Sequence, residues 1–328
     1  MKRIAFHIDN LSFRGTTTAV KDYAYFNEKL LGNKSIIFLD KSIKYSEQDE
    51  NFIHRLKILN DYKDLFDVIE YQNVDNFEEM LQKNNCDYVY FLKAGFNDGA
   101  FSKTTKSLIH CVFNHNQPHG YKYSYISKWL AREASGNELN YVPHIVNLPK
   151  TTDSNFRKVN NIEESQFVIG RYGGFEQFDI DFVKQTILFI AESDPTITFV
   201  FVNTRKFINF SHPRILFFDS IIDAQEKTNF ISSCDAMIHA RSDGESFGLS
   251  ICEFLFHNKP VISFGQVRDK NNVELLGKYK LIYNNQYELL ECIFKLKYNL
   301  YKNCPECIVK EFSPENVMRR FDKIFLGD

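Results

Sequence analysis

Short apolar runs alternate with amphipathic helical patterns along most of the chain. This alternation is typical of parallel strands joined by helices, because each crossover returns the chain to the same edge of a sheet. In the first half the pattern predicts helices over 17–31, 52–65 and 123–132. It predicts strands over 3–8, 35–39, 67–71, 87–92, 109–113 and 141–146.

The alternation stops at 147–155, a polar stretch that contains Pro149 and indicates a linker. It then restarts and predicts strands over 167–170, 197–202, 215–218, 236–239, 261–264 and 280–283. We therefore expect an α/β protein of two Rossmann-like domains facing across a cleft. The expected segments are an N-terminal domain over 1–150, a C-terminal domain over 151–312 and a closing helix over 313–328.

The charge balance argues against nucleic acid as a partner. The chain has 328 residues, with 40 Lys and Arg against 42 Asp and Glu, and its first 150 residues hold 19 basic and 18 acidic residues. Neither half has the basic excess of a nucleic-acid binder. No segment approaches the ~20 apolar residues of a membrane-spanning helix, and the first apolar run stops at Asp9 without a signal-peptide pattern. We expect a cytoplasmic protein, with peripheral membrane contact left open.

Two short patterns suggest metal sites, but their context favours other interpretations. Asp179 and Asp181 directly precede a helical pattern, which predicts one helix cap and one acid in the first turn. Cys304 and Cys307 form a single Cys-x-x-Cys without a second pair, which predicts a loop with two thiols. The seven cysteines lie mostly in apolar runs, as buried reduced thiols do.

The densest chemical signal lies between 235 and 253, where the pattern predicts a strand, a polar turn and a helix. A helix beginning near Phe247 would direct its free amides toward a phosphate, and Gly248 would let a ligand approach the backbone. Glu245 precedes the helix and Glu253 lies about two turns into it, so one carboxylate could reach a sugar and the other a ribose. The alternative is two solvated carboxylates on a surface helix. Six residues are candidates: Glu245, Ser246, Phe247, Gly248, Leu249 and Glu253.

The two glutamates, followed by Lys-Pro-Val-Ile at 259–262, resemble the Glu-seven-Glu motif of retaining GT-B glycosyltransferases. The chain is similar to glycosyltransferase family four, in particular to its bacterial and large-DNA-virus members. Further matches lie at Val142-Pro143, Gly170-Arg171 and Phe312-Ser313-Pro314. The resemblance implies transfer of a sugar, with retention, from a nucleotide-diphosphate sugar to a carbohydrate or glycan acceptor hydroxyl. It implies donor binding by the C-terminal domain, acceptor binding by the N-terminal domain, and no metal or other cofactor.

The resemblance also implies roles for individual residues. Glu253 would hold the ribose and Glu245 the transferred sugar, while the amides around Gly248 would face the diphosphate. Arg171 would neutralise the departing diphosphate, which lowers the barrier to transfer.

One departure from the family concerns the diphosphate. The family usually has a lysine where this chain has Glu176 and Gln177. The missing cation keeps a second hypothesis open, a non-catalytic relative that binds sugar nucleotides. Arg205, Lys206 and Arg241 are candidate substitutes for it.

In the N-terminal domain, Gly15 lies between the first strand and the first helix, where the family has a glycine-containing loop beneath donor and acceptor; a simple turn glycine is the alternative. The loop lacks the three-glycine dinucleotide fingerprint, which argues against a nicotinamide-linked oxidoreductase. A strand ending near Asn114 would place His115 and His119 on a loop facing the cleft, where the family has a histidine near the reacting sugar. We favour His119 over His115, and the alternative is a histidine that only hydrogen-bonds its neighbours.

Overall fold

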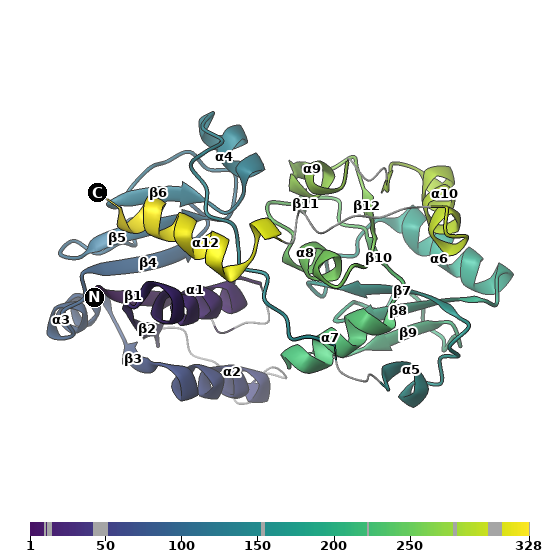
Figure 1. The fold of residues 1–328 in the computed structure, drawn as a ribbon, viewed down its shortest axis with the longest axis horizontal. Coiled ribbons are helices and arrows are strands. Elements are labelled where there is room, and N and C mark those ends of the chain that lie inside the picture. Colours follow the sequence, from purple (N-terminus) through teal and green to yellow (C-terminus); the bar gives the residue numbers. More distant parts are fainter. Residues whose placement is uncertain are drawn as a thin grey trace. The chain divides into compact units, whose positions relative to one another are not determined.

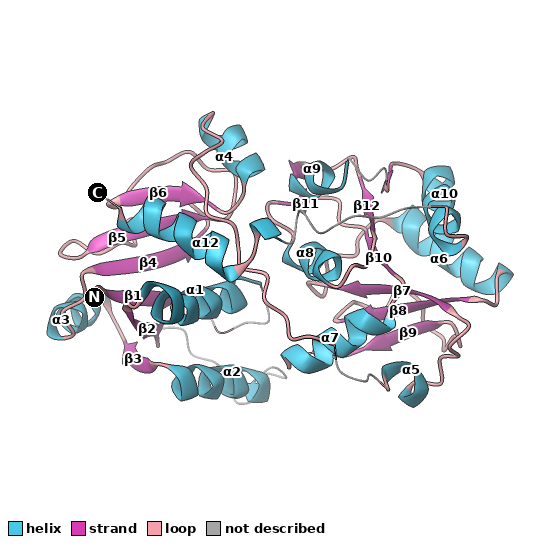
Figure 2. Ribbon diagram, in the orientation of Figure 1, coloured by secondary structure: helices cyan, strands magenta, loops and turns pink. Residues whose placement is uncertain are grey.

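The computed structural model describes residues 1–9, 11, 15–41, 52–151, 155–221, 223–277, 281–300 and 310–327. The chain divides into two compact units, which we call unit 1 (1–145 and 314–328) and unit 2 (146–313). Each unit contains a six-stranded parallel sheet covered by helices (Figures 1 and 2). None of the helices in the described ranges combines the length and apolar character needed to cross a membrane.

Unit 1 has a parallel sheet of order β3-β2-β1-β4-β5-β6: strands are added on one side of β1 up to β3, and then on its other side from β4 onward, so the strand order reverses between β1 and β4. Its elements are β1 (Arg3–Ile8), α1 (Gly15–Leu31), β2 (Lys34–Asp40), α2 (Phe52–Leu65), β3 (Asp67–Tyr71), α3 (Val74–Lys83), β4 (Tyr88–Lys93), β5 (Lys106–Cys111), β6 (Lys122–Tyr125), α4 (Lys128–Ser135), α12 (Pro314–Phe321) and a terminal π-helix (Asp322–Leu326).

The two faces of this sheet explain why its strands are apolar throughout. Successive side chains of a strand point to opposite faces. Ile4, Phe6 and Ile8 of β1 pack in the core cluster formed with α1, α2 and α12. Ala5 packs in the opposite cluster, with Phe77 of α3. Both sets are removed from water, so neither face needs polar positions.

The last helix belongs to unit 1, although it follows unit 2 in the sequence. The ring of Phe321 stacks on Tyr23 of α1 at 5.5 Å and lies 5.6 Å from Tyr90 of β4. Figure 1 shows α12 beside α1 on this face of the sheet. The C-terminal segment therefore completes the core of the N-terminal sheet.

Two predictions in unit 1 were wrong. The helix expected over 123–132 begins only at Lys128, where the Ser127 side chain accepts from the backbone N–H of Leu130, and residues 122–125 form strand β6 instead. The run 141–146 is not a strand: it makes a single bridge, between Tyr141 and Tyr125. Pro143 follows at once and has no N–H to continue a ladder.

Unit 2 has the equivalent strand order, β14-β12-β10-β7-β8-β9. Its strand order reverses between β7 and β10. Its elements are α5 (Phe156–Val159), β7 (Phe167–Tyr172), α6 (Asp181–Ser193), β8 (Ile197–Val202), β9 (Ile215–Phe218), α7 (Ala224–Ser233), β10 (Ala236–His239), β11 (Gly244–Glu245), α8 (Leu249–Phe256), β12 (Val261–Phe264), β13 (Asp269–Lys270), α9 (Asn271–Gly277), β14 (Ile282–Tyr283) and α10 (Gln286–Lys297).

The reversal between β7 and β10 matters for function. These strands are parallel neighbours, with Met237 opposite Gly170. In open α/β sheets, ligands bind beyond the carboxyl ends of the strands where the strand order reverses. The residues that follow Gly170 and His239 therefore occupy the position where this fold forms binding sites.

Candidate functional site

The turn after β10 brings Glu245 back to the carboxyl edge of the sheet of unit 2. Glu245 ends the two-residue strand β11, which pairs with β13. Its neighbour Gly244 has φ 75°, and a Cβ added there would lie 2.1 Å from the carbonyl oxygen of Asp269. Only glycine fits this position, so Gly244 is a steric requirement of the turn that carries Glu245.

The helix of the motif begins two residues later than predicted. Gly248, with φ 87°, occupies the N-cap position of α8, and Leu249 is the first helical residue. Phe247 is buried against the ring of Phe312 at 5.2 Å, and its carbonyl accepts from the Asn271 side chain. Ser246 and Leu249 are partly exposed on either side. The free amides at the start of α8 thus follow Gly248 directly.

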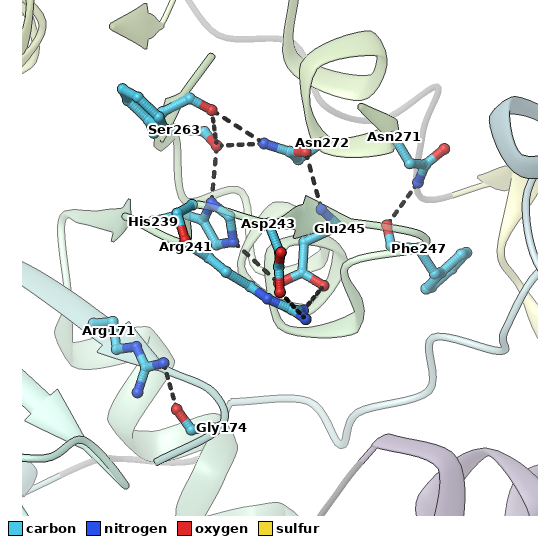
Figure 3. Close-up of polar contacts among 12 residues, drawn as sticks. Arg171, Gly174, His239, Arg241, Asp243, Glu245, Phe247, Ser263, Asn271 and Asn272 are labelled. Carbon is cyan, nitrogen blue, oxygen red and sulfur yellow. Dashed lines mark hydrogen bonds and ion pairs between the residues drawn. The ribbon is translucent and has the colours of Figure 1, made fainter. Parts of the chain in front are cut away.

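The carboxylate of Glu245 is shared between two side chains (Figure 3). Oε1 lies 3.1 Å from Nε2 of His239, and Oε2 accepts from Nη1 of Arg241 at 3.1 Å. Burial raises the pKa of Glu245, but its hydrogen bonds with His239 and Arg241, together with the charge of Arg241, outweigh burial and leave the pKa below its ordinary value. Glu245 is therefore held as a carboxylate.

Arg171, at the end of β7, is almost fully buried. Its guanidinium donates to the carbonyl oxygens of Asn203 (2.9 Å) and Gly174 (2.7 Å) and to Oγ1 of Thr204 (2.6 Å). Burial lowers the pKa of Arg171 to about 10, although the nearby charge of Glu245 opposes that shift. Arg171 therefore holds two loops of the carboxyl edge together.

Asp179 fastens the loop after β7 to the turn after β10. Its carboxylate accepts from the backbone N–H of Ser242 at 2.8 Å and from the Ser242 hydroxyl at 2.7 Å. The predicted cap was wrong, because Ile180 occupies the N-cap position of α6 without a side-chain hydrogen bond. Asp181 is the predicted first-turn acid and pairs with Lys184. The Arg171 loop and the Arg241 turn are thereby fixed side by side.

The second glutamate of the motif lies in a different environment. Glu253 is on the second turn of α8, closer to the helix start than the two turns expected, and it is buried. Its Oε1 accepts from Nζ of Lys227, on α7, at 2.7 Å. The Lys227 ammonium also lies over the ring of Tyr172, 5.1 Å from its centroid. Glu253 is thus one half of a buried ion pair rather than a solvated surface carboxylate.

The candidate substitutes for the missing lysine lie in different places. Arg205 is exposed and pairs with Glu176, and Lys206 is exposed. Arg241 lies in the cluster around Glu245, and its side chain is 18% exposed. Only Arg241 of the three touches the motif in the described part of unit 2.

In unit 1, the structure separates the two candidate histidines. β5 ends at Cys111, three residues before the expected end near Asn114. His115 lies close to that end, with its ring 5.5 Å from Phe96. The chain then returns to the amino edge of the sheet before β6 begins, and there the backbone N–H of Tyr121 donates to the carbonyl oxygen of Ser107 at the start of β5. His119 lies on this return path, buried, with Nδ1 2.7 Å from the carbonyl oxygen of Gln117.

His119 also lines a cavity of about 380 Å³ with Asn116, Tyr121, Tyr123 and Asn140. His115, unlike His119, lies at the carboxyl edge where ligands bind in this kind of sheet. Gly15 is exposed at the first position of α1. Most of the loop before it lies outside the described residues, as do Cys304 and Cys307.

Sequence reasoning missed several residues of the unit 2 cluster. His239, Ser263 and Asn272 lie on separate elements and meet only in the fold (Figure 3). The signal available in the sequence was a polar residue near the end of an apolar strand. His239 is such a residue in β10, and Ser263 is another in the neighbouring strand β12.

Solved structures share this fold over the whole chain. A glycosyltransferase from Rickettsia africae matches with a TM-score of 0.70 and 16% identity, covering 100% of this chain and 99% of that one. HepE of Anabaena, in complex with UDP and glucose, matches with a TM-score of 0.70 and 14% identity, covering 98% and 99%. A Listeria monocytogenes protein assigned as a UDP-N-acetylglucosamine 2-epimerase matches with a TM-score of 0.61 and 12% identity, covering 98% and 94%.

These likenesses confirm the predicted fold class: two Rossmann-like units of the GT-B type. Because the fold also occurs in a protein assigned as an epimerase, it does not choose a reaction by itself. A scan against protein-family models and a comparison with curated proteins found no match.

Proposed function

We propose that this protein is a glycosyltransferase that takes a sugar from a nucleotide-diphosphate donor and transfers it, with retention, to a hydroxyl of a carbohydrate or glycan acceptor. The observation that carries the proposal is the cluster at the strand reversal of unit 2. There Glu245, Arg241, Arg171 and the start of α8 follow the carboxyl ends of two adjacent strands. HepE binds UDP and glucose on the same fold, which makes UDP-sugars the first donors to test.

The proposed roles in unit 2 follow from charge. The amides at the start of α8 bind the diphosphate, because a helix N-terminus favours an anion. Arg171 stabilises the charge that develops on the leaving diphosphate. Glu245 contacts the transferred sugar. Glu253 binds the ribose through Oε2, since Oε1 accepts from Lys227.

Unit 1 supplies the acceptor side in this proposal. His115 is now the stronger candidate for the group near the reacting sugar, because of its place at the carboxyl edge, and Gly15 begins the helix that follows the first strand. Retention requires the acceptor oxygen to attack from the face that the diphosphate leaves. Exclusion of water then limits hydrolysis of the donor. We propose no metal or other cofactor for this reaction.

The first experiment is thermal stabilisation of the protein by UDP-, GDP-, ADP- and CMP-linked sugars without added metal. Each sugar that stabilises the protein is then incubated with glycan acceptors. Release of the nucleotide is measured, and NMR gives the anomeric configuration of the product. Glu245→Gln, which keeps the shape but removes the charge, is expected to slow release about 100-fold. Glu192→Gln makes the same substitution at an exposed position of α6 and is the matched control, which should not change the rate.

Each other outcome has a distinct meaning. Binding without release would favour the non-catalytic relative. Conversion of UDP-N-acetylglucosamine to its 2-epimer without an acceptor would replace the transferase proposal with an epimerase. If no donor stabilises the protein, or if Glu245→Gln releases nucleotide at the wild-type rate, the proposed site is wrong.

A further inference from the structure

Four residues of unit 2 form a closed ring of hydrogen bonds that contains both the backbone and the side chain of Glu245 (Figure 3). The backbone N–H of Glu245 donates to Oδ1 of Asn272 at 3.3 Å, and Nδ2 of Asn272 donates to Oγ of Ser263 at 2.9 Å. Oγ of Ser263 lies 2.9 Å from Nδ1 of His239. Nε2 of His239 lies 3.1 Å from Oε1 of Glu245 and closes the ring.

The ring joins elements that are far apart in the sequence. His239 ends β10, Ser263 lies in β12, Asn272 lies in α9, and Glu245 ends β11. Ser263 and Asn272 are fully buried, and His239 is 6% exposed. Three buried side chains thus form one network around Glu245, with Asn272 at its backbone and His239 at its carboxylate.

The donors and acceptors of the ring can be assigned in one consistent direction. Ser263 accepts from the Asn272 amide, and its single proton has two acceptors in reach, His239 Nδ1 at 2.9 Å and the Phe264 carbonyl at 3.4 Å. The shorter contact makes His239 Nδ1 the acceptor. The proton of a neutral imidazole then lies on Nε2, which donates to Glu245. Asn272 therefore selects, through Ser263, the tautomer of His239 that binds the carboxylate.

We propose that His239 is a positioning residue that fixes the carboxylate of Glu245, and that Ser263 and Asn272 act through it by setting its tautomer. The inference rests on the proposed function, in which Glu245 contacts the sugar. A glutamate that is already held at its backbone and its side chain loses little rotamer freedom when a ligand binds. More of the free energy of its contact with the sugar then contributes to binding. Arg241 then completes the arrangement from the other oxygen.

Unit 1 contains the same hydrogen-bonded pair without a charge attached to it. Nδ2 of Asn27 donates to Oγ of Ser35 at 2.9 Å, and both residues are fully buried. There the serine hydroxyl donates to the carbonyl oxygen of Ala24. The pair holds α1 to β2 and ends on the backbone. It provides a matched control for the loss of a buried Asn–Ser bond.

The first test replaces His239 by glutamine or by asparagine, because the side-chain amide of each can take the place of one of the two imidazole nitrogens. A glutamine amide reaches the position of Nε2, and an asparagine amide reaches only the position of Nδ1. His239→Gln should keep UDP-glucose affinity and UDP release within about threefold of wild type. His239→Asn, which keeps only the Ser263 contact, should lose about tenfold or more, the usual effect of removing a hydrogen bond to a charged group.

The second test changes the tautomer without touching His239. In Asn272→Asp, the new carboxylate accepts the Ser263 proton, so Nδ1 of His239 must carry a proton of its own. The ring then either gives up the Nε2 proton that faces Glu245 or becomes an imidazolium, and in both cases it is no longer the neutral tautomer with its proton on Nε2. The ¹⁵N shifts of the two ring nitrogens should report this change, and UDP release should fall about tenfold. Asn27→Asp should lower the melting temperature by a comparable amount, with the ¹⁵N shifts of His239 and UDP release unchanged.

Equal losses in His239→Gln and His239→Asn would overturn the proposal, since the Glu245 contact would then not matter. So would an Asn272→Asp variant that keeps the wild-type tautomer and rate. A wild-type protein that neither binds nor hydrolyses UDP-glucose would count against the proposed function instead. In that case the ¹⁵N measurement still decides whether Asn272 sets the tautomer of His239.

Discussion

The two units have the same strand order, yet they bury polar groups in opposite ways. In unit 1, His110 lies in the core with Nδ1 2.7 Å from the Tyr90 hydroxyl, and His144 packs beside Tyr23. Unit 2 also contains ion pairs that are buried or partly buried: Lys227 with Glu253, and Arg241 with Glu245. The first arrangement is stable only while the histidines are neutral, and the second only while both charges are present. The same sheet architecture can therefore bury ionisable side chains either in their neutral form or as pairs of opposite charge.

The largest expected effect is acid destabilisation of unit 1. Burial lowers the pKa of both His110 and His144 to about 3, from about 6.5 in the unfolded chain. Between pH 6.5 and pH 3 the unfolded state therefore binds more protons than the folded state. The two histidines cost no stability above pH 6.5, and the free energy of unfolding falls as the pH drops from 6.5 toward 3. At pH 5 each histidine should cost ~2 kcal/mol of unfolding free energy.

Trp129, the single tryptophan, lies buried in α4 of unit 1 and reports this loss by fluorescence in urea titrations. A comparison of pH 7 with pH 5 avoids most carboxylate titration, because the ordinary pKa of Asp and Glu lies lower. An unchanged Trp129 midpoint would contradict the description of unit 1 as a core that requires neutral histidines.

The next effect removes one charge from the buried pair of unit 2. Lys227→Met leaves the Glu253 carboxylate buried without its cation, and removal of one partner of such a pair costs ~3 kcal/mol or more. Lys227→Met/Glu253→Gln removes both charges and should recover part of the loss. Urea unfolding followed by far-UV circular dichroism at pH 7 measures both variants. A double variant no more stable than Lys227→Met would show that neutralising Glu253 does not relieve the loss, which would contradict an uncompensated Glu253 charge as its cause.

The smallest expected effect distinguishes an arginine in the proposed binding site from an exposed arginine nearby. Arg241 and Arg268 both approach Asp243, at 3.9 and 3.4 Å, but the Arg241 side chain is partly buried against Glu245 and Arg268 is exposed. Arg241→Ala should weaken UDP-glucose binding about tenfold, since it removes a charged hydrogen-bond donor from the site. Arg268→Ala should change the affinity less than twofold. Isothermal titration of both variants checks this, and equal affinities would remove Arg241 from the proposed site.

Most of the fold could be predicted because both sheets are covered on two faces. The apolar runs 197–202, 215–218, 236–239 and 261–264 match β8, β9, β10 and β12. The failures lie at the edge of the first sheet. There β6 is short and alternates polar and aromatic residues, so helix and strand patterns are hard to separate.

The motif around Glu245 could also be predicted, but its contacts could not. The order of a glycine turn, a glutamate and a helix start at a strand end is visible in the sequence, and the positive φ angles of Gly244 and Gly248 explain the two glycines. The partners of each carboxylate depend on tertiary packing. Glu245 finds His239 and Arg241, while Glu253 finds Lys227 from another helix. The reason is physical: backbone geometry is set by neighbours in the chain, whereas ion pairs and hydrogen-bonded rings are set by the packing of distant elements.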